Sequence, residues 1–245
     1  MPDAKDREQV PDKESILRGA LRLARENRMI IVLSIALLVF VYLLQNVMSG
    51  DIRRIDGIAY QFFVVRLRRD WLTPIMQSFT SLSAPVVLAV MLIVVAAFAP
   101  GRMPGRFAAA NLVGIVALNY ALKEIVQRPR PEGFRLIAES GYSFPSGHSM
   151  IAMGFYGLLA WMAWTYERDP VVRRVSVLGF STVVILVGIS RIYLGVHYAS
   201  DVIAGFCLSL AWLALYTTMV GPILLPEKKT NLGADQTSLM GKLEE

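Results

Sequence analysis

The chain has 245 residues, of which 55% are hydrophobic and 18% charged, and its net charge is +6. A soluble domain usually carries a charge on about a quarter of its residues, so this composition argues against an ordinary soluble enzyme. The positive charge fits anionic lipids as partners. It does not indicate nucleic acid, because no basic patch is interleaved with aromatic residues in a soluble module.

The first membrane span is predicted at residues 29–48, which contain no charged side chain. A run of about 20 apolar residues is the length needed to cross roughly 30 Å of hydrocarbon. A cleaved signal peptide is the competing interpretation, but the run is too long, follows a mostly polar segment and lacks a small-residue cleavage pattern. Residues 14–25 place arginines opposite apolar residues at helical spacing, which predicts either a helix on an anionic membrane surface or a solvated charged tail.

Five further spans complete a predicted all-α membrane protein with six transmembrane helices in one bundle. They are expected at residues 71–99, with a break at 83–85, and at 107–125, 149–166, 175–190 and 202–220. The break is expected because a proline cannot continue a helix without losing a backbone hydrogen bond. The single cysteine, Cys207, leaves no disulfide or cysteine metal site within one chain.

We therefore divide the chain into three parts. Residues 1–28 form a cytoplasmic N-terminal segment, residues 29–220 form the membrane domain, and residues 221–245 form a polar tail that we expect to be disordered. Basic residues near helix ends favour the cytoplasmic side of a membrane. We therefore expect the cytoplasm on the side of the bundle that has the N-terminal segment, Arg102, Arg106, Arg168, Arg173, Arg174, Lys228 and Lys229. The first outer loop also carries arginines, which either oppose this orientation or attract an acidic lipid headgroup. They are Arg53, Arg54, Arg66, Arg68 and Arg69.

Polar islands at the outer helix ends carry the candidate chemistry. Lys123 lies near the end of the third span, where it either binds a ligand or snorkels to the interface. Pro129 and Pro131 keep Arg128 and Arg130 out of a helix. Arginine suits bidentate contact with phosphate oxygens, so either arginine is a candidate ligand, and both also fit a merely basic membrane surface.

The second island, residues 145–148, has the sequence Pro-Ser-Gly-His and predicts a tight turn into a helix start. Gly147 permits close approach of the backbone, and free N–H groups at the helix start face an anion. Ser146 adds a hydroxyl donor, so a phosphate fits there, although helix caps of this composition are common.

The chain has only two histidines, His148 and His197. His197 and Asp201 are spaced i, i+4, which predicts that they share one face of a helix and form a hydrogen bond. The carboxylate would then fix the imidazole tautomer and free the other nitrogen for attack. A structural pair that caps the helix is the alternative, and Arg191 lies near enough across a loop to hold the group under attack.

These three islands resemble the three-part signature of the type 2 phosphatidic acid phosphatase family. The matching motifs are Lys123-x6-Arg130-Pro131, Pro145-Ser146-Gly147-His148 and Ser190-Arg191-x5-His197-x3-Asp201. Each motif alone is weak, and the order and separation of all three carry the resemblance. It extends over about residues 71–220, implies an acid phosphatase / vanadium haloperoxidase-like core, and selects Arg130 over Arg128.

The resemblance also implies a mechanism. His197 would attack phosphorus to give a phosphohistidine, Asp201 would orient it, and His148 would protonate the leaving oxygen and later activate water. The implied ligands of the phosphoryl oxygens are Lys123, Arg130, Ser146, Gly147 and Arg191. No metal or other cofactor is required, because cations of the chain would stabilise the developing charge.

The implied substrate is a membrane lipid phosphate such as phosphatidylglycerol phosphate, undecaprenyl pyrophosphate or phosphatidic acid. The chain is expected in a bacterial cytoplasmic membrane with its site at the outer, periplasmic face. Soluble vanadium haloperoxidases have a similar signature, but six spans argue against them. A non-catalytic protein that binds or moves lipid phosphates is the alternative function, and the pair of histidines argues against it.

Overall fold

The computed structural model describes residues 14, 17, 18, 22, 27–98 and 103–225. Every regular element in these residues is a helix, as predicted. In chain order the helices are α2 (Arg28–Ser49), α3 (Arg53–Tyr60), η1 (Gln61–Arg66), α4 (Leu72–Ser81), α5 (Pro85–Phe98), α6 (Met103–Val126), α7 (Gly147–Tyr166), α8 (Pro170–Tyr193), α9 (Ala199–Met219) and α10 (Gly221–Leu224).

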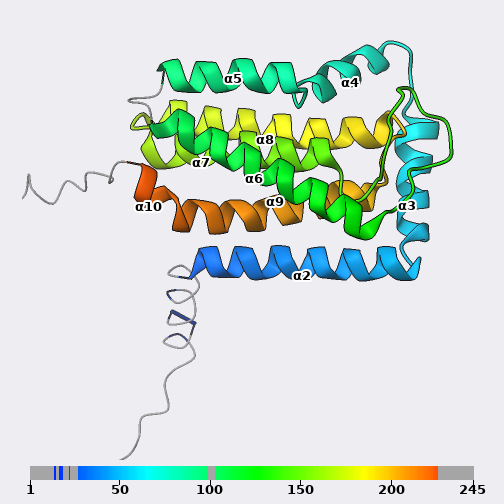
Figure 1. Cartoon of the computed structure of the whole chain (residues 1–245), viewed down its shortest axis with the longest axis horizontal. Coiled ribbons are helices and arrows are strands. Elements are labelled where there is room, and N and C mark those ends of the chain that lie inside the picture. Colours follow the sequence, from blue (N-terminus) through cyan, green and yellow to red (C-terminus); the bar gives the residue numbers. More distant parts are fainter. Residues whose placement is uncertain (1–13, 15–16, 19–21, 23–26, 99–102, 226–245) are drawn as a thin grey trace, which may run out of the picture.

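The long helices lie side by side, and each successive one runs back along the bundle (Figure 1). Helices α4 and α5 together make one traverse along an outer edge, and α2 makes another at the opposite edge. The short helix α3 crosses one end of the bundle, nearly perpendicular to the rest. The connections 127–146 and 194–198 lie at this same end, so these non-helical segments are gathered beside α3.

Four of the helices in the described residues are long and apolar enough to cross a membrane. They are Met29–Ser49, Met103–Val126, Pro170–Tyr193 and Ala199–Met219. The pair Leu72–Ser81 and Pro85–Phe98 is bent by 55° and makes a fifth span if it counts as one. The chain is therefore a multi-span membrane protein, and the predicted break in the second span is confirmed just before Pro85.

Helix α7 occupies the place of the remaining predicted span. It is 20 residues long, but its Ser, Gly, Trp and Tyr residues lower its mean hydropathy, and it is not among the helices that qualify as spans. It packs against α6, α8 and α9. A helix enclosed by neighbours needs close packing more than an apolar outer face, which explains this composition.

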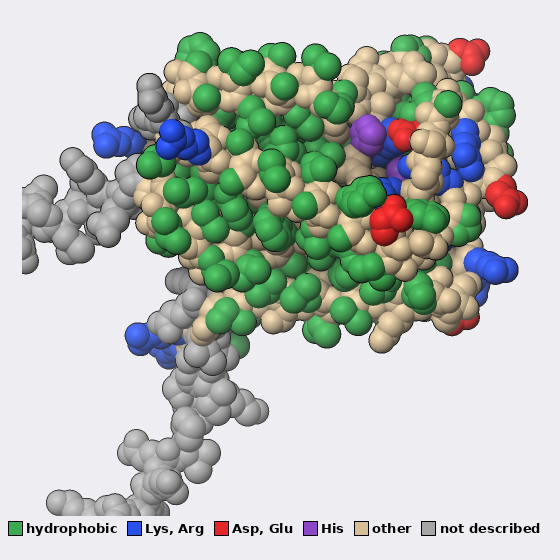
Figure 2. Space-filling view, viewed as in Figure 1, with side chains coloured by type: hydrophobic (Ala, Val, Ile, Leu, Met, Phe, Trp, Pro, Cys, Tyr) green, Lys and Arg blue, Asp and Glu red, His purple; other side chains and the backbone are tan. Residues whose placement is uncertain are grey.

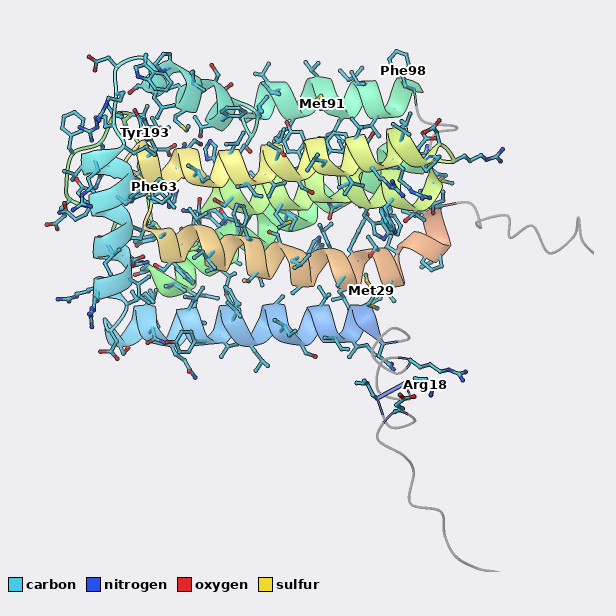
Figure 3. The ribbon with its side chains drawn as sticks, turned by 180° about the vertical axis from the view of Figure 1, so that it is seen from behind. Arg18, Met29, Phe63, Met91, Phe98 and Tyr193 are labelled. Carbon is cyan, nitrogen blue, oxygen red and sulfur yellow. The ribbon has the colours of Figure 1, made fainter. Side chains whose placement is uncertain are left out.

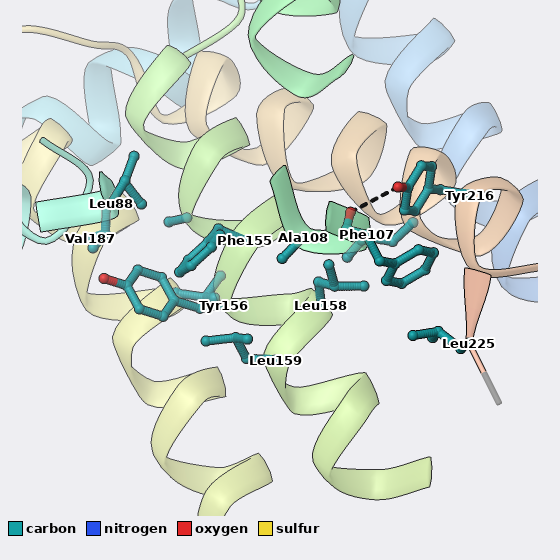
Figure 4. Close-up of a cluster of buried hydrophobic side chains, with 13 residues drawn as sticks. Leu88, Phe107, Ala108, Phe155, Tyr156, Leu158, Leu159, Val187, Tyr216 and Leu225 are labelled. Carbon is teal, nitrogen blue, oxygen red and sulfur yellow. Dashed lines mark hydrogen bonds between the residues drawn. The ribbon is translucent and has the colours of Figure 1, made fainter. Parts of the chain in front are cut away.

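The core of the bundle forms around α7 (Figure 4). Phe155 and Leu158 of α7 are fully buried and belong to one cluster with Phe107 of α6 and Tyr216 of α9. The Tyr216 hydroxyl donates to the Phe107 carbonyl oxygen at 2.8 Å, so its polar end is satisfied inside the core. This packing fixes α6, α7 and α9 relative to one another.

The outer helices α2 and α5 present apolar side chains to the surroundings (Figure 3). On α2, Leu38 is 70% exposed, and on α5 Val86 is 75% and Phe98 84% exposed. In water such a surface would be costly, whereas in a bilayer the hydrocarbon chains cover it.

The structure corrects two predicted boundaries. The loop predicted after the first span is helical, because α3 and η1 occupy Arg53–Arg66, and buried Asp56 ties α3 to the bundle. The predicted tail does not begin at residue 221, because α10 continues the domain and Leu225 is buried in the core cluster. Leu224 and Leu225 pack against this cluster, and burying their apolar side chains explains why α10 stays with the domain, whereas Ile223 is exposed. The rest of the predicted tail and most of the segment 14–25 lie outside the described residues.

Candidate active site

Every site residue predicted from the sequence lies at the end of the bundle that α3 crosses. Lys123 is near the end of α6, Arg191 is in the last turn of α8, and His148 is in the first turn of α7. His197 lies in the short connection between α8 and α9. Figure 2 shows the histidine side chains recessed among charged side chains there, whereas apolar side chains cover most of the face away from that end.

The His197 side chain is buried, and only 3% of the residue is exposed. Its Nε2 lies 3.1 Å from Arg130 Nη1. Because a guanidinium can only donate, this contact assigns the lone pair to Nε2 and the proton to Nδ1. Nδ1 faces Ser143 Oγ at 3.4 Å and Asp201 Oδ2 at 3.5 Å. Burial lowers the pKa of His197 to about 4 even though Asp201 opposes the shift, so the imidazole is neutral at pH 7.

His197 and Asp201 do not share a helix, which corrects the prediction. Helix α9 begins at Ala199, so His197 precedes it and Asp201 lies in its first turn. Asp201 Oδ2 accepts a hydrogen bond from Tyr198 N at 2.9 Å and one from Ser143 Oγ at 2.5 Å. The sequence left two alternatives for Asp201, a partner that orients the imidazole or a cap of the helix. In the structure its carboxylate both faces the imidazole and caps the start of α9.

Arg130 connects the two non-helical segments of the site. Its Nη1 donates to the Val196 carbonyl oxygen at 3.0 Å, next to its contact with His197. Its Nε and Nη2 donate to the carbonyl oxygens of Gly141 and Ser140 at 3.1 and 3.0 Å. The guanidinium is therefore held in place by backbone and lies directly in front of the imidazole lone pair.

Arg191 is 1% exposed and is paired with a carboxylate that the sequence did not single out. Its Nη2 donates to Glu139 Oε1 at 2.5 Å, and its Nη1 donates to Thr80 Oγ1 at 2.8 Å. Glu139 Oε2 also lies 3.7 Å from Arg130 Nη2. Burial opposes the ionisation of Glu139, but the charge and hydrogen bond of Arg191 outweigh it and lower the pKa of this carboxyl.

Lys123 and Ser146 lie at the two ends of the segment that joins α6 to α7. Lys123 Nζ donates to the Tyr142 carbonyl oxygen. Ser146 is the residue before α7; it is buried, and its backbone N–H donates to the Asp201 carbonyl oxygen at 3.0 Å. Gly147 follows where the chain is crowded, because an added Cβ would lie 2.9 Å from Asn119 Oδ1.

His148 is half-buried at the start of α7. Its backbone carbonyl oxygen accepts a hydrogen bond from Ser83 Oγ at 3.3 Å, and Ser83 lies in the break between α4 and α5. Its imidazole lies near enough to Arg191 and Glu139 to interact with their charges. The break in the second span thus supports one of the two histidines.

Sequence reasoning missed Glu139, Ser143 and Asp56, and it left Arg128 without a role once the family spacing had selected Arg130 as the phosphate ligand. No motif marks them, because each acquires its partners from segments that are distant in the chain. Among the residues that the structure describes, no three side chains of the His, Cys, Asp and Glu types gather as a metal site requires.

Known proteins resemble this chain in sequence and in fold. The PAP2 superfamily matches residues 105–223, which include all three motifs. Phosphatidylglycerophosphatase B of Bacillus subtilis (strain 168) is 34% identical over 155 residues, which cover 60% of this chain and 74% of that protein. The chain belongs to the PAP2 superfamily.

Two further relatives of this PAP2 protein are similar over different lengths. Lipid A 1-phosphatase of Rhizobium johnstonii is 33% identical over 109 residues, which are 40% of each protein. The crystal structure of a transmembrane PAP2 type phosphatidylglycerolphosphate phosphatase from Bacillus subtilis superposes with a TM-score of 0.71 at 29% identity, over 78% of this chain and 96% of that one. The family expected from the motifs is thus confirmed, and the chain is a membrane phosphatase.

Proposed function

We propose that this PAP2 phosphatase removes the terminal phosphate of a membrane lipid through a phosphohistidine on His197. One observation carries the proposal: the buried, neutral imidazole presents the lone pair of Nε2 to Arg130, a cation that suits phosphate oxygens. On the other side of the ring, Nδ1 faces Asp201, which stabilises the positive charge that forms on attack.

The chemistry takes two displacements at phosphorus. Nε2 of His197 forms a bond to phosphorus while the bond to the lipid oxygen breaks, and His148 gives that oxygen a proton. His148 then takes a proton from water, whose oxygen attacks the phosphohistidine and releases inorganic phosphate and the free imidazole. Positive charge around the transferred group comes from Lys123, Arg130 and Arg191, while Ser146 and Gly147 offer a hydroxyl and the backbone N–H at the start of α7.

The ion pair of Glu139 belongs to the resting state. Its carboxylate contacts Arg191 and Arg130 at 2.5 and 3.7 Å, which are the two arginines assigned to the phosphoryl oxygens. A phosphate and this carboxylate have the same charge sign and compete for the same donors. Substrate binding therefore displaces Glu139 from at least one arginine.

The substrate class follows from the position of the site beside an apolar surface. We propose that α7 crosses the membrane with the five other traverses, and that the site opens on the periplasmic face of a bacterial inner membrane. Arg168, Arg173 and Arg174 lie at the opposite end of the bundle, which the positive-inside rule assigns to the cytoplasm. Phosphatidylglycerol phosphate, undecaprenyl pyrophosphate and phosphatidic acid each present a phosphate on an apolar anchor; the relatives named for phosphatidylglycerophosphate favour the first.

The test uses the purified full-length protein in detergent with a panel of these three lipids. We expect phosphate release in the presence of EDTA, inhibition by vanadate, and loss of turnover in His197→Ala and His148→Ala. Brief incubation with radiolabelled lipid phosphate should leave acid-labile, base-stable label on the wild type and none on His197→Ala. Unimpaired hydrolysis by His197→Ala would reject the nucleophile, and lipid binding without phosphate release would favour the lipid-binding alternative.

A further inference from the structure

Arg128 lies behind the carboxylate that faces His197. Its Nη1 donates to Asp201 Oδ1 at 2.5 Å and to Ser200 Oγ at 2.8 Å, and its Nη2 donates to Asp56 Oδ2 at 2.8 Å. The side chain is 11% exposed. Arg128 is therefore committed to two buried carboxylates and does not share the place of Arg130 in front of the imidazole.

Asp56 reaches this pair from α3, the helix that crosses the end of the bundle. It is 4% exposed, and its two oxygens accept hydrogen bonds from Ser200 N at 2.9 Å and Ser200 Oγ at 2.7 Å. Asp56 thus binds the first turn of α9 and the guanidinium of Arg128 together. This joins α3 to the helix that carries Asp201.

The two oxygens of Asp201 have different partners as a result. Arg128 holds Oδ1, while Oδ2 accepts from Ser143 and Tyr198 and faces His197 Nδ1 at 3.5 Å. The guanidinium also stacks over the Tyr198 ring, with its central carbon 4.0 Å from the ring centre. A carboxylate held at both oxygens cannot rotate, so its direction toward the imidazole is fixed.

We propose that Arg128 and Asp56 are positioning residues: Arg128 holds Asp201 so that its Oδ2 stays aimed at His197, and Asp56 holds Arg128. This inference rests on the proposed function for its effect on turnover. Along Asp56, Arg128 and Asp201 the charges alternate as carboxylate, guanidinium and carboxylate. Removing Arg128 leaves two buried carboxylates without the cation between them, and removing the charge of Asp56 leaves a matched pair.

The two changes therefore act on His197 with different signs. Besides Asp201, the ionisable groups near His197 are Arg130, Arg191 and His148. When a neutral residue replaces Arg128, the carboxylate of Asp201 no longer interacts with a guanidinium. It then stabilises the imidazolium of His197 more strongly. Arg128→Gln should therefore raise the pKa of His197, by about one unit, whereas Asp56→Asn should not raise it.

The chain has only two histidines, so its imidazoles can be followed directly. The full-length protein is labelled with 15N-histidine in detergent, and His148→Gln assigns the signals. In the wild type we expect His197 to carry its proton on Nδ1 and to titrate near the acidic value set by burial, a pKa of about 4. In Arg128→Gln we expect a higher pKa, because Asp201 no longer shares its charge with Arg128.

Turnover and thermal stability are measured on the same variants. We expect Arg128→Gln to lower kcat about 100-fold with little change in KM, because a misdirected catalytic group costs about that much. The double variant Asp56→Asn/Arg128→Gln removes one of the two buried carboxylates that Arg128→Gln leaves without a cation, so it should regain part of the melting temperature but not kcat. Arg53→Gln is the matched control, because Arg53 is an exposed arginine of α3 that lines a cavity of about 660 Å³ together with Asp56 and Arg128.

Three results would overturn the inference. They are an unchanged His197 signal in Arg128→Gln, full recovery of kcat with stability in the double variant, and a rise in KM at constant kcat, which would make Arg128 a substrate ligand. Failure of the proposed function looks different. If the wild type releases no phosphate while Arg128→Gln alters the His197 signal, the positioning role stands and the hydrolytic one does not.

Discussion

The Glu139 carboxylate should compete with phosphate for Arg191 and Arg130, and this competition can be measured directly. Its carboxylate pairs with Arg191 at 2.5 Å and approaches Arg130 at 3.7 Å, with a side chain that is 25% exposed. A hydrogen bond between charged groups contributes about 1.5 to 3 kcal/mol, and partial exposure to water reduces it toward the lower end of that range. Since about 1.4 kcal/mol equals a factor of ten in binding, Glu139→Gln should tighten the binding of a phosphate analogue about tenfold.

The assay is inhibition of the purified protein by vanadate at several substrate concentrations. Glu132→Gln is the matched control, because Glu132 lies in the same loop and is exposed. We expect the vanadate inhibition constant of Glu139→Gln to fall about tenfold and that of the control to stay at the wild-type value. A constant that is unchanged or higher in Glu139→Gln would refute the competition and would show instead that Glu139 holds Arg191 in its binding position.

Two further predictions concern the connection that carries His197. Gly195 has a φ of +74°, and an added Cβ would lie 2.3 Å from the Phe134 carbonyl oxygen, so Gly195→Ala should cost at least about 1 to 2 kcal/mol. We expect a melting temperature lower by several degrees and a reduced kcat. An unchanged melting temperature together with normal turnover would contradict this. Because burial lowers the pKa of His197 to about 4, protonation of its imidazole should not lower kcat/KM until the pH approaches that value. Below it kcat/KM should fall about tenfold per unit, since the protonated ring has no lone pair, and an acidic limb near pH 6.5 would contradict the buried imidazole.

The helices and the family could be predicted from the sequence because both depend on local patterns. Apolar runs of spanning length predicted α2, α6, α8 and α9 to within a few residues, and Pro85 predicted the break before α5. Two helices are exceptions: α10 replaces the start of a predicted disordered tail, and after α2 a predicted loop is replaced by α3. Its short amphipathic pattern is stabilised by contacts with the distant start of α9, which no local window contains.

The sequence alone thus determined that the chain spans a membrane and that two histidines, three cations and one carboxylate meet at one end. Alternating helices necessarily return these islands to the same face, because each span reverses the direction of the chain. Only the tertiary structure decided which arginine faces the imidazole and which lies behind the carboxylate. Arg128 and Arg130 are two residues apart in one Arg-Pro repeat, and their opposite roles depend on Asp56 and His197, which are 72 and 67 positions away. Such long-range pairings follow from packing and have no local signal in the chain.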